Sequence, residues 1–520
     1  MTGDLLNYLS GRVLFGVALI PLLGIAFTII WIVVWRGTRF WDLDRFWKRL
    51  WQGWTIVFAL YIAVWSWHRP LSIPVRVVVY TEAVPGDASG GWIADACADA
   101  IVSGLTASPR HFSLLRSEFV PALARVKRDG LESLAKRLKV CWLVVVSAAD
   151  SKPRIEILRL GLGGYKRRWE GSPSGSTIAE KAAGAAIQVA QQLGDPNSRP
   201  ASFLIPASLP DSDYSDFYRA IQLRREELPD SAAAVFTRLI DAHSGWIRPR
   251  LELALTWFDF DPGKRGADIH EHLMAAIAAD STSLDSYILL GHYFLYMRNW
   301  DMTESAFRLG LSIAPNDPRP YYYLALLDEH RLQGMTMKSK QELLERAMDI
   351  APGYESARLE LGKVRQQLRE RNVVNKLLED GLEIDPGSVE LLISLSANEL
   401  AQAEFDSAAV SCGQILALDP GNYRAFYNLG IARMWLQQFD GALAAFDSAL
   451  AHGGSEDCYF YKGVTCVRMK DYPKAIKMFQ ERMARSKTKD DPFGMKARDL
   501  INKIQGWMES DSSGAILLTE

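Results

Sequence analysis

Two long apolar runs stand near the start of the chain. Residues 13–35 and residues 50–67 contain no charged side chain, and about 20 apolar residues in a helix are enough to cross a bilayer. A small-residue cleavage site does not follow the first run, where Trp35 and Arg36 stand instead, so an uncleaved helix is favoured over a signal peptide. The pattern predicts a membrane hairpin in residues 1–69.

The loop between these runs, residues 36–49, is basic and aromatic. Five basic residues oppose only Asp42 and Asp44, and basic residues in short loops stay in the cytoplasm. The bulk of the chain is therefore expected on the extracytoplasmic, periplasmic side of a bacterial cytoplasmic (inner) membrane. Anchoring in the headgroup region is favoured over a specific lipid-binding role. The expected interface residues are Arg36, Arg39, Trp41, Arg45, Trp47, Lys48 and Arg49.

Residues 71–195 alternate between strand and helix patterns. The segment VRVVVYT at 75–81 has the character of a buried strand, and apolar side chains recur every four residues in the segment that follows. Another buried strand is predicted at VCWLVVVSA, and a hairpin is predicted to turn at Gly163 and Gly164. The order strand, helix, strand, helix, three strands and helix predicts a small α/β domain with helices packed on a mixed sheet.

This order resembles the TolB amino-terminal domain, which recurs before TPR repeats in membrane-tethered class III cyclases and winged-helix regulators. The resemblance rests on VRVVVYT, GGWIADACADAIVSGL, LAKRLKVCWLVVVSA and LRLGLGGYKRRWEGS. The last segment carries a tryptophan near its end, where the family strand ends in a conspicuous tryptophan. The chain departs from the family at Ala96, where glycine is usual, and lacks the usual Pro-Phe after the first strand. Neither a cyclase nor a DNA-binding pattern stands before this segment.

From about Asp213 the sequence becomes periodic. Prolines end similar segments at 315, 352, 386 and 420, which are 37, 34 and 34 residues apart. The pattern resembles the tetratricopeptide repeat (TPR) family, whose unit is a pair of helices in 34 residues. About eight repeats are predicted over residues 213–489, after a linker at 196–212 and before a capping helix and tail at 490–520. In the clearest copy, family positions 4, 7, 8, 20, 24 and 27 hold Phe426, Leu429, Gly430, Ala442, Phe446 and Ala449.

The TPR resemblance implies a superhelix whose concave face binds a peptide or protein. In the family, positions 2, 5, 9, 12 and 13 of each first helix line that groove. Here these positions are aromatic and aliphatic with scattered charge, without a Lys/Asn/Arg clamp, so an apolar helix or extended segment is the expected ligand. Packing of some of these side chains inside the superhelix is the alternative. The expected partner-binding residues are His292, Tyr296, Tyr322, His330, Arg424, Tyr427, Met434 and Trp435.

Charge and cysteine content narrow the classes of function. The chain has 59 Lys and Arg against 61 Asp and Glu, a net charge of −2, whereas nucleic-acid-binding proteins usually carry a basic excess. No nucleic-acid partner is therefore expected. The five cysteines are odd in number and contain no CxxC, which favours buried free thiols over a disulfide framework or a zinc site.

No segment carries the pattern of a catalytic, cofactor or metal site. GLGGYK lacks the GK[ST] and the following helix of a phosphate-binding loop, which favours a turn. Asp95 with Asp99, and Glu156 with Glu170, are interpreted as solvated carboxylates and not as acid–base pairs. HEH at 270–272 places its histidines on different sides of a helix, which favours surface histidines. No enzymatic activity and no cofactor are expected.

The leading hypothesis is a membrane-anchored, non-catalytic TPR adaptor that recruits or stabilises a partner protein or membrane complex. The predicted fold class is a multidomain chain with an α-helical membrane hairpin, a small α/β domain and an all-α TPR solenoid, and a homo-oligomer is compatible with it. A transmembrane sensor or regulator is the second hypothesis, and its short cytoplasmic loop would need a separate output partner. A chaperone similar to those of cytochrome c maturation is the third, although those proteins lack the α/β domain.

Overall fold

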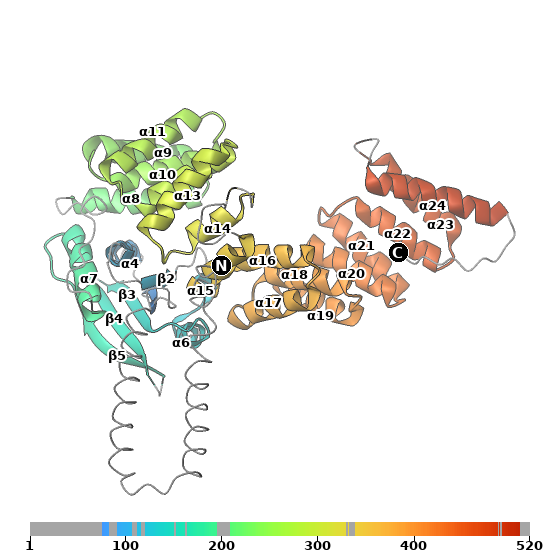
Figure 1. Cartoon of the computed structure of the whole chain (residues 1–520), viewed down its shortest axis with the longest axis horizontal. Helices are drawn as coiled ribbons and strands as arrows, with labels where there is room; N and C mark the ends of the chain where they lie inside the picture. The colour runs from blue at the N-terminus through green and yellow to red at the C-terminus, as the bar shows by residue number, and fades with distance from the viewer. Residues whose placement is uncertain are drawn as a thin grey trace, which may run out of the picture. The chain divides into compact units, whose positions relative to one another are not determined.

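The computed structural model gives the fold of most of the chain beyond the two apolar runs (Figure 1). The predicted membrane helices and all seven predicted interface residues lie outside the described residues. These described residues are 75–82, 91–106, 112–115, 120–149, 152–161, 164–194, 209–328, 331, 339–486, 488 and 491–509.

The first described part is a five-stranded mixed sheet with helices. The sheet order is β2-β1-β3-β4-β5; β1 pairs in parallel with β2 and β3, and β3, β4 and β5 form an antiparallel meander. The strands are β1 (Val75–Glu82), β2 (Phe112–Leu115), β3 (Trp142–Ala149), β4 (Lys152–Gly161) and β5 (Gly164–Gly171). The helices are α4 (Gly91–Thr106), α5 (Ala122–Arg125), α6 (Arg128–Arg137) and α7 (Ile178–Gln192).

Alternating side chains of β3 build a core on each face of the sheet. Val144 and Val146 point toward the cluster that α4 and α7 complete, whereas Leu143 and Val145 point toward the cluster that includes α6. Successive residues of a strand face opposite sides, so a strand such as β3, which carries apolar side chains on both faces, must be covered twice. The small α/β domain is therefore a sheet with helices on both faces.

The second described part is a helical solenoid of TPR type. Its helices follow in pairs, each first helix packing against the second helix of its own repeat (Figure 1). The pairs are α8 (Asp211–Arg225) with α9 (Pro229–Ala242), α10 (Ile247–Phe260) with α11 (Gly266–Ala279), α12 (Leu284–Tyr296) with α13 (Trp300–Ile313), α14 (Arg319–Ala325) with α15 (Lys340–Ile350), α16 (Glu355–Gln367) with α17 (Arg371–Ile384), α18 (Val389–Ala401) with α19 (Phe405–Leu418), α20 (Tyr423–Trp435) with α21 (Phe439–Ala451), and α22 (Asp457–Arg468) with α23 (Tyr472–Ala484). A final helix, α24 (Pro492–Glu509), packs on α23.

A glycine facing a phenylalanine ring sets the close approach within several helix pairs. A Cβ atom added at Gly430 would lie 2.5 Å from Phe446, and one added at Gly291 would lie 2.4 Å from Phe307. Both rings are fully buried. Because no side chain larger than hydrogen fits at these two positions, the two helices meet through the ring, as the sequence pattern of positions 8 and 24 predicts.

Most turns inside the repeats close on a residue with positive φ. At Ala403, φ is 60°, and the next backbone N–H, of Glu404, donates to the carbonyl of Glu399 at 2.9 Å. This is the geometry of a left-handed helix end, in which the following N–H bonds a carbonyl of the last turn. The same conformation recurs at Glu227, Arg298, Arg369, Gln437 and Lys470.

Contacts join the α/β domain to the middle of the array. Arg76 of β1, which is 5% exposed, donates from Nε to the carbonyl of Ile350 at 3.2 Å and from Nη2 to that of Asp349 at 2.5 Å. Burial lowers the pKa of Arg76, yet it still places a positive charge at the carboxyl end of α15, where the helix dipole favours a cation. Arg125 also forms an ion pair with Asp385, just after α17.

The predicted localisation requires a correction. In the part of the chain that the structure describes, no helix is both long and apolar enough to cross a bilayer. Repeat helices are shorter than the roughly 20 residues that a span needs, and α24, with 18 residues, contains Lys496, Arg498, Asp499 and Lys503. This finding contradicts the prediction of a bacterial inner-membrane protein with a periplasmic bulk.

Candidate functional site

The α/β domain covers the inner surface of the first repeat. We call positions 2, 5, 9, 12 and 13 of each first helix the inner positions, counted from the small residue at position 8. In the first repeat that residue is Ala220, so positions 2, 5 and 9 are Tyr214, Phe217 and Ile221, all buried. The ring of Tyr214 lies 6.5 Å from that of Trp92 in α4. A partner therefore has no access to these side chains.

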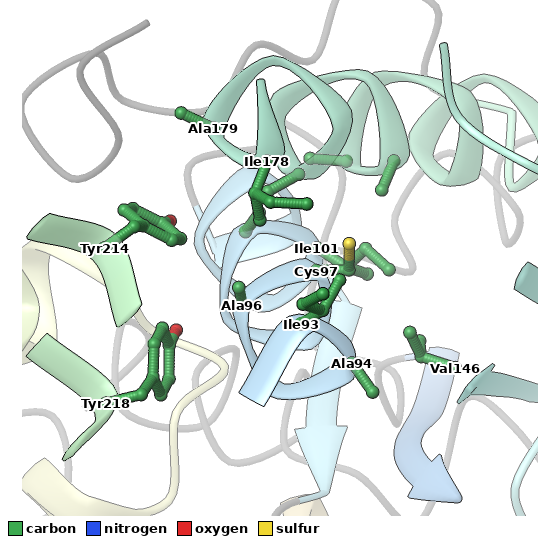
Figure 2. Packing of buried hydrophobic residues seen from close by; sticks show 14 of the residues in the cluster. Ile93, Ala94, Ala96, Cys97, Ile101, Val146, Ile178, Ala179, Tyr214 and Tyr218 are labelled. Atoms are coloured by element: carbon green, nitrogen blue, oxygen red, sulfur yellow. The ribbon is translucent and has the colours of Figure 1, made fainter. Parts of the chain in front are cut away.

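Figure 2 shows this packing: Tyr214 and Tyr218 of α8 face the side of α4 that carries Ala96, and Ile93 lies beside Cys97 and Ile101. These side chains belong to one continuous apolar cluster that includes the sheet residue Val146. The cluster runs from the sheet through α4 into the first repeats. The α/β domain and the first repeats consequently share a core.

A charged network completes the contact between α4 and the first two repeats. Asp99 accepts hydrogen bonds from the Tyr218 hydroxyl at 2.7 Å and from Nη2 of Arg248 at 3.2 Å. Arg248 occupies inner position 2 of the second repeat, counted from Ala254. Burial alone would lower the pKa of Arg248, but Asp99, Tyr218 and Glu252 raise it. The arginine that opens the second repeat is thus satisfied by the chain's own carboxylates.

Two of the four predicted partner-binding residues of the third and fourth repeats, His292 and Tyr322, pack against other rings of the chain. His292 is half-buried with its ring centroid 4.2 Å from that of Tyr323, and burial together with nearby Arg319 lowers its pKa to about 4. Tyr322 packs against Tyr354 at 5.3 Å. Tyr296 is 50% exposed. His330 lies outside the described residues.

The predicted residues of the seventh repeat divide into exposed and buried groups. Trp435 is 39% exposed and Met434 is 1% exposed. Arg424 is exposed and pairs with Glu390 at 3.0 Å. Tyr427 is half-buried, with its ring 5.6 Å from that of Tyr461, and burial raises its pKa. Met434 therefore packs among the repeats and offers no surface to a partner, whereas Trp435 and Arg424 remain accessible.

Trp435 belongs to a stack of three side chains from three consecutive repeats. Its ring is parallel to that of Phe405, at 5.5 Å and 8°, and the guanidinium carbon of Arg468 lies 4.2 Å from its centroid. Phe405 begins α19, Trp435 ends α20 and Arg468 ends α22. The stack fixes the indole while leaving part of it exposed. Sequence reasoning identified Trp435 but missed Arg468, although Arg468 holds inner position 13 of the eighth repeat, counted from Gly463.

The carboxylates of the α/β domain lie in structural contacts. Burial and the neighbouring Asp99 raise the pKa of Asp95, while Asp99 itself joins the network with Tyr218 and Arg248. Burial would raise the pKa of Glu156, but hydrogen bonds from Arg128 and Arg167 lower it. Arginines of the fold pair with Asp99 and with Glu156.

Glu170 and the histidines of HEH, which the sequence did not predict as site residues, also contact neighbouring side chains of the fold. Glu170 pairs with Arg167 at 2.5 Å. The His270 ring lies 5.6 Å from that of Tyr293, and the His272 ring lies 5.3 Å from that of Trp257. Within the described residues, no three His, Cys, Asp or Glu side chains are placed to hold a metal ion.

Comparison with known proteins identifies repeats of the same kind. Residues 399–459, which run from the end of α18 into α22, match the tetratricopeptide repeat family. No curated protein matches the chain in sequence. The chain therefore carries TPR repeats in a TPR-like solenoid, a fold consistent with protein–protein interaction.

Several solved structures are similar to parts of the chain. Yeast Tom70 is 14% identical with a TM-score of 0.38 over 60% of this chain and 68% of that one. The APC/C hetero-tetramer Cut9–Hcn1 is 15% identical with a TM-score of 0.39 over 56% of each chain, so the alignment spans a little over half of that relative. MamA is 17% identical with a TM-score of 0.26 over 32% of this chain and 90% of that one.

Proposed function

We propose that this protein is a non-catalytic TPR adaptor whose later repeats bind a segment of a partner protein. Its first repeats hold its own α/β domain in the place where a partner segment would lie. The binding residues of this proposal are Tyr427 and Trp435, with Arg424 beside them. Met434 is removed from the proposed set because it is buried.

One observation carries the proposal: coverage of the inner positions differs along the array. In the first two repeats Tyr214 and Arg248 are covered by α4. From the fifth repeat on, inner positions stay accessible at Lys363, Gln366 and Trp435. A large aromatic side chain that remains partly in water is a common anchor for a partner protein.

The proposal predicts that removing two rings abolishes capture of a partner. Full-length tagged protein is cross-linked in cells that produce it naturally, and the proteins recovered with it are identified. Truncation of an aromatic anchor often costs about 2 kcal/mol in binding, so Tyr427→Ala with Trp435→Ala should lower recovery of a stoichiometric partner at least about tenfold. The melting curve of the variant is recorded beside that of the wild type.

A matched control uses exposed side chains outside the inner positions. Tyr423 and Val410 are 42% and 62% exposed, and Tyr423→Ala with Val410→Ala should leave recovery unchanged. If the Tyr427 and Trp435 variant loses stability but keeps its partner, these rings pack inside the superhelix and the proposal is wrong. Recovery of many unfolded clients in place of one partner would favour a chaperone.

We further propose that residues 71–195 are a TolB amino-terminal-like domain that serves here as a wedge between repeats. Support comes from the element order and from Trp169 near the end of β5. Its role as a wedge rests on the shared apolar cluster with α8 and on the Arg76 contacts with α15. Superposition on experimental TolB amino-terminal domains should overlay all five strands in the same order, and a different strand order would rule the resemblance out.

A further inference from the structure

The arginines of the last three repeats differ in how their charge is balanced. Three of these arginines lie within ion-pair distance of a carboxylate. The matched arginines are Arg424 with Glu390, Arg482 with Asp457 and Asp491, and Arg485 with Glu456 and Glu481. Arg433 donates only to the carbonyl of Gly441 at 3.3 Å.

Arg468 also has no carboxylate partner in the described part of the chain, and it lies beside the proposed binding residue Trp435. Among the described residues, no carboxylate stands within 4.0 Å of it, and its guanidinium carbon lies 4.2 Å from the centroid of the Trp435 ring. Burial lowers the pKa of Arg468, because the guanidinium loses water without gaining an anion. A partly desolvated cation of this kind is stabilised when a carboxylate approaches it.

We propose that the Trp435–Arg468 pair binds a protein segment in which an acidic side chain stands next to a large apolar one. This rests on the proposed function and names the chemistry of its partner. The carboxylate bonds the guanidinium edge, which stacking leaves free, and the apolar side chain covers the exposed part of the indole. Arg468 thus determines specificity, while Trp435 supplies contact area.

The length of the segment follows from the positions on one helix. Tyr427 and Trp435 are eight residues apart on α20, or about 12 Å along its axis at 1.5 Å per residue. An extended segment advances about 3.3 Å per residue, so about four residues span both rings. The second apolar contact, at Tyr427, therefore falls three or four residues from the acidic one.

The favoured occupant is a protein and not a nucleic acid. The indole and guanidinium could also stack on a base and pair with a phosphate. However, carboxylates pair with Arg424, Arg482 and Arg485, so these three arginines do not extend a basic track from Arg468, and the chain has a net charge of −2. Binding to single strands depends on such a track.

The test selects peptides against the full-length protein. A phage-displayed library of random 12-residue peptides is panned on the wild type, and enriched peptides are synthesised for fluorescence anisotropy. We expect Asp or Glu adjacent to Leu, Ile, Phe or Trp in the enriched sequences. Arg468→Gln should weaken their binding at least about tenfold, as should replacing the acidic residue by its amide, whereas Arg468→Lys should retain part of the affinity.

Arg485 supplies the matched control. Its guanidinium also lies over a ring, 4.3 Å from Tyr459, but Glu456 and Glu481 already balance its charge. Arg485→Gln should therefore leave peptide binding unchanged. Melting curves of both variants should match the wild type, since neither guanidinium lies in an apolar cluster.

The outcomes separate this inference from the proposed function. Peptides that need Tyr427 and Trp435 but bind Arg468→Gln as well as the wild type would overturn the acidic-segment inference and leave the adaptor standing. Enriched peptides without acidic residues, or displacement of bound peptide by a single-stranded oligonucleotide, would also overturn it. Absence of any peptide that depends on Tyr427 or Trp435 would overturn both.

Discussion

Gly430 lies against the ring of Phe446, where a Cβ atom would come within 2.5 Å. A flexible side chain could move away, but the phenylalanine is fully buried among the helices of its own and the next repeat. Protein interiors are packed as densely as molecular crystals, so no space is available into which the ring could move. The identity of this one residue therefore fixes the distance between α20 and α21.

The first prediction compares two glycines of the array. Gly430→Ala should destabilise the protein by about 1–3 kcal/mol through overpacking. Gly413 lies in the middle of α19 with no atom within 4 Å of its Cβ position, so Gly413→Ala should stabilise by about 0.5–1 kcal/mol. Urea unfolding followed by circular dichroism measures both. Equal stability of the two variants would show that the ring relaxes.

At the scale of the residue, the sequence predicts where a small or a large side chain is required better than it predicts which side chains are exposed. Gly430 and Phe446 stand at family positions 8 and 24, and the structure brings them together. Met434 stands at a position that lines the groove in the family, yet it is 1% exposed. The rotation between repeats decides which side of a first helix faces the next repeat. The spacing of residues along the sequence does not specify that rotation.

At the scale of the element, the turn between paired helices is the recurring unit. Ala403 has a φ of 60° and is followed by the N–H of Glu404, which bonds the last turn of α18. A Cβ atom makes this left-handed conformation costly by about 1 kcal/mol. None of the six residues in this conformation within repeats is a glycine, so each turn carries this cost.

The second prediction follows from that strain. Ala403→Gly should stabilise the protein by about 0.5–1 kcal/mol because glycine adopts positive φ readily. Ala401→Gly, two residues earlier in the helical part of α18, should destabilise by about 1 kcal/mol because glycine is a poor helix former. Thermal melts of the two variants give the comparison. A loss of stability in Ala403→Gly would mean that flexibility of the unfolded chain outweighs the relieved strain.

Elements of the array were predictable because their pattern repeats. Strand β3 and helix α4 were predictable for another reason, since long apolar or amphipathic runs determine their type before any tertiary contact. The four-residue helix α5 has no such run and was not predicted. Its ends are set by Pro121 and by the extended residue Val126, a local arrangement that carries little hydrophobic signal.

At the scale of the whole described molecule, Arg76 connects sheet and solenoid. Its hydrogen bonds reach residues 273 and 274 positions later in the chain, and a Cβ atom at Gly353 in the adjacent loop would come within 2.8 Å of Val120. The loop after α15 therefore has no room for a larger side chain at Gly353 beside the α/β domain. Such long-range contacts cannot be read from local patterns, since the pattern around each partner predicts its own element and not the element that it contacts.

The third prediction tests this connection. Arg76→Met keeps the side-chain volume but leaves the carbonyls of Asp349 and Ile350 without this donor, which should cost about 1–3 kcal/mol. Hydrogen exchange should rise in β1, α6 and α15 and stay unchanged in α22 and α23, because repeats contact only their neighbours. Arg154 is exposed and pairs with Glu170, so Arg154→Met should change stability by less than about 0.5 kcal/mol. Uniform exchange along the array would contradict the prediction.

The two-point attachment of the α/β domain also limits how this chain can change its length. Repeat proteins commonly gain and lose units by tandem duplication, because each unit contacts only the next. Here α4 binds the first two repeats and Arg76 and Arg125 bind the segment from α15 to α17. A unit inserted or deleted between these attachments would pull one of them apart, whereas a unit added beyond α18 would disturb neither. Evolution of repeat number is therefore expected to concentrate in the half of the array that carries the proposed binding residues, where a new unit would also enlarge the surface available to partners.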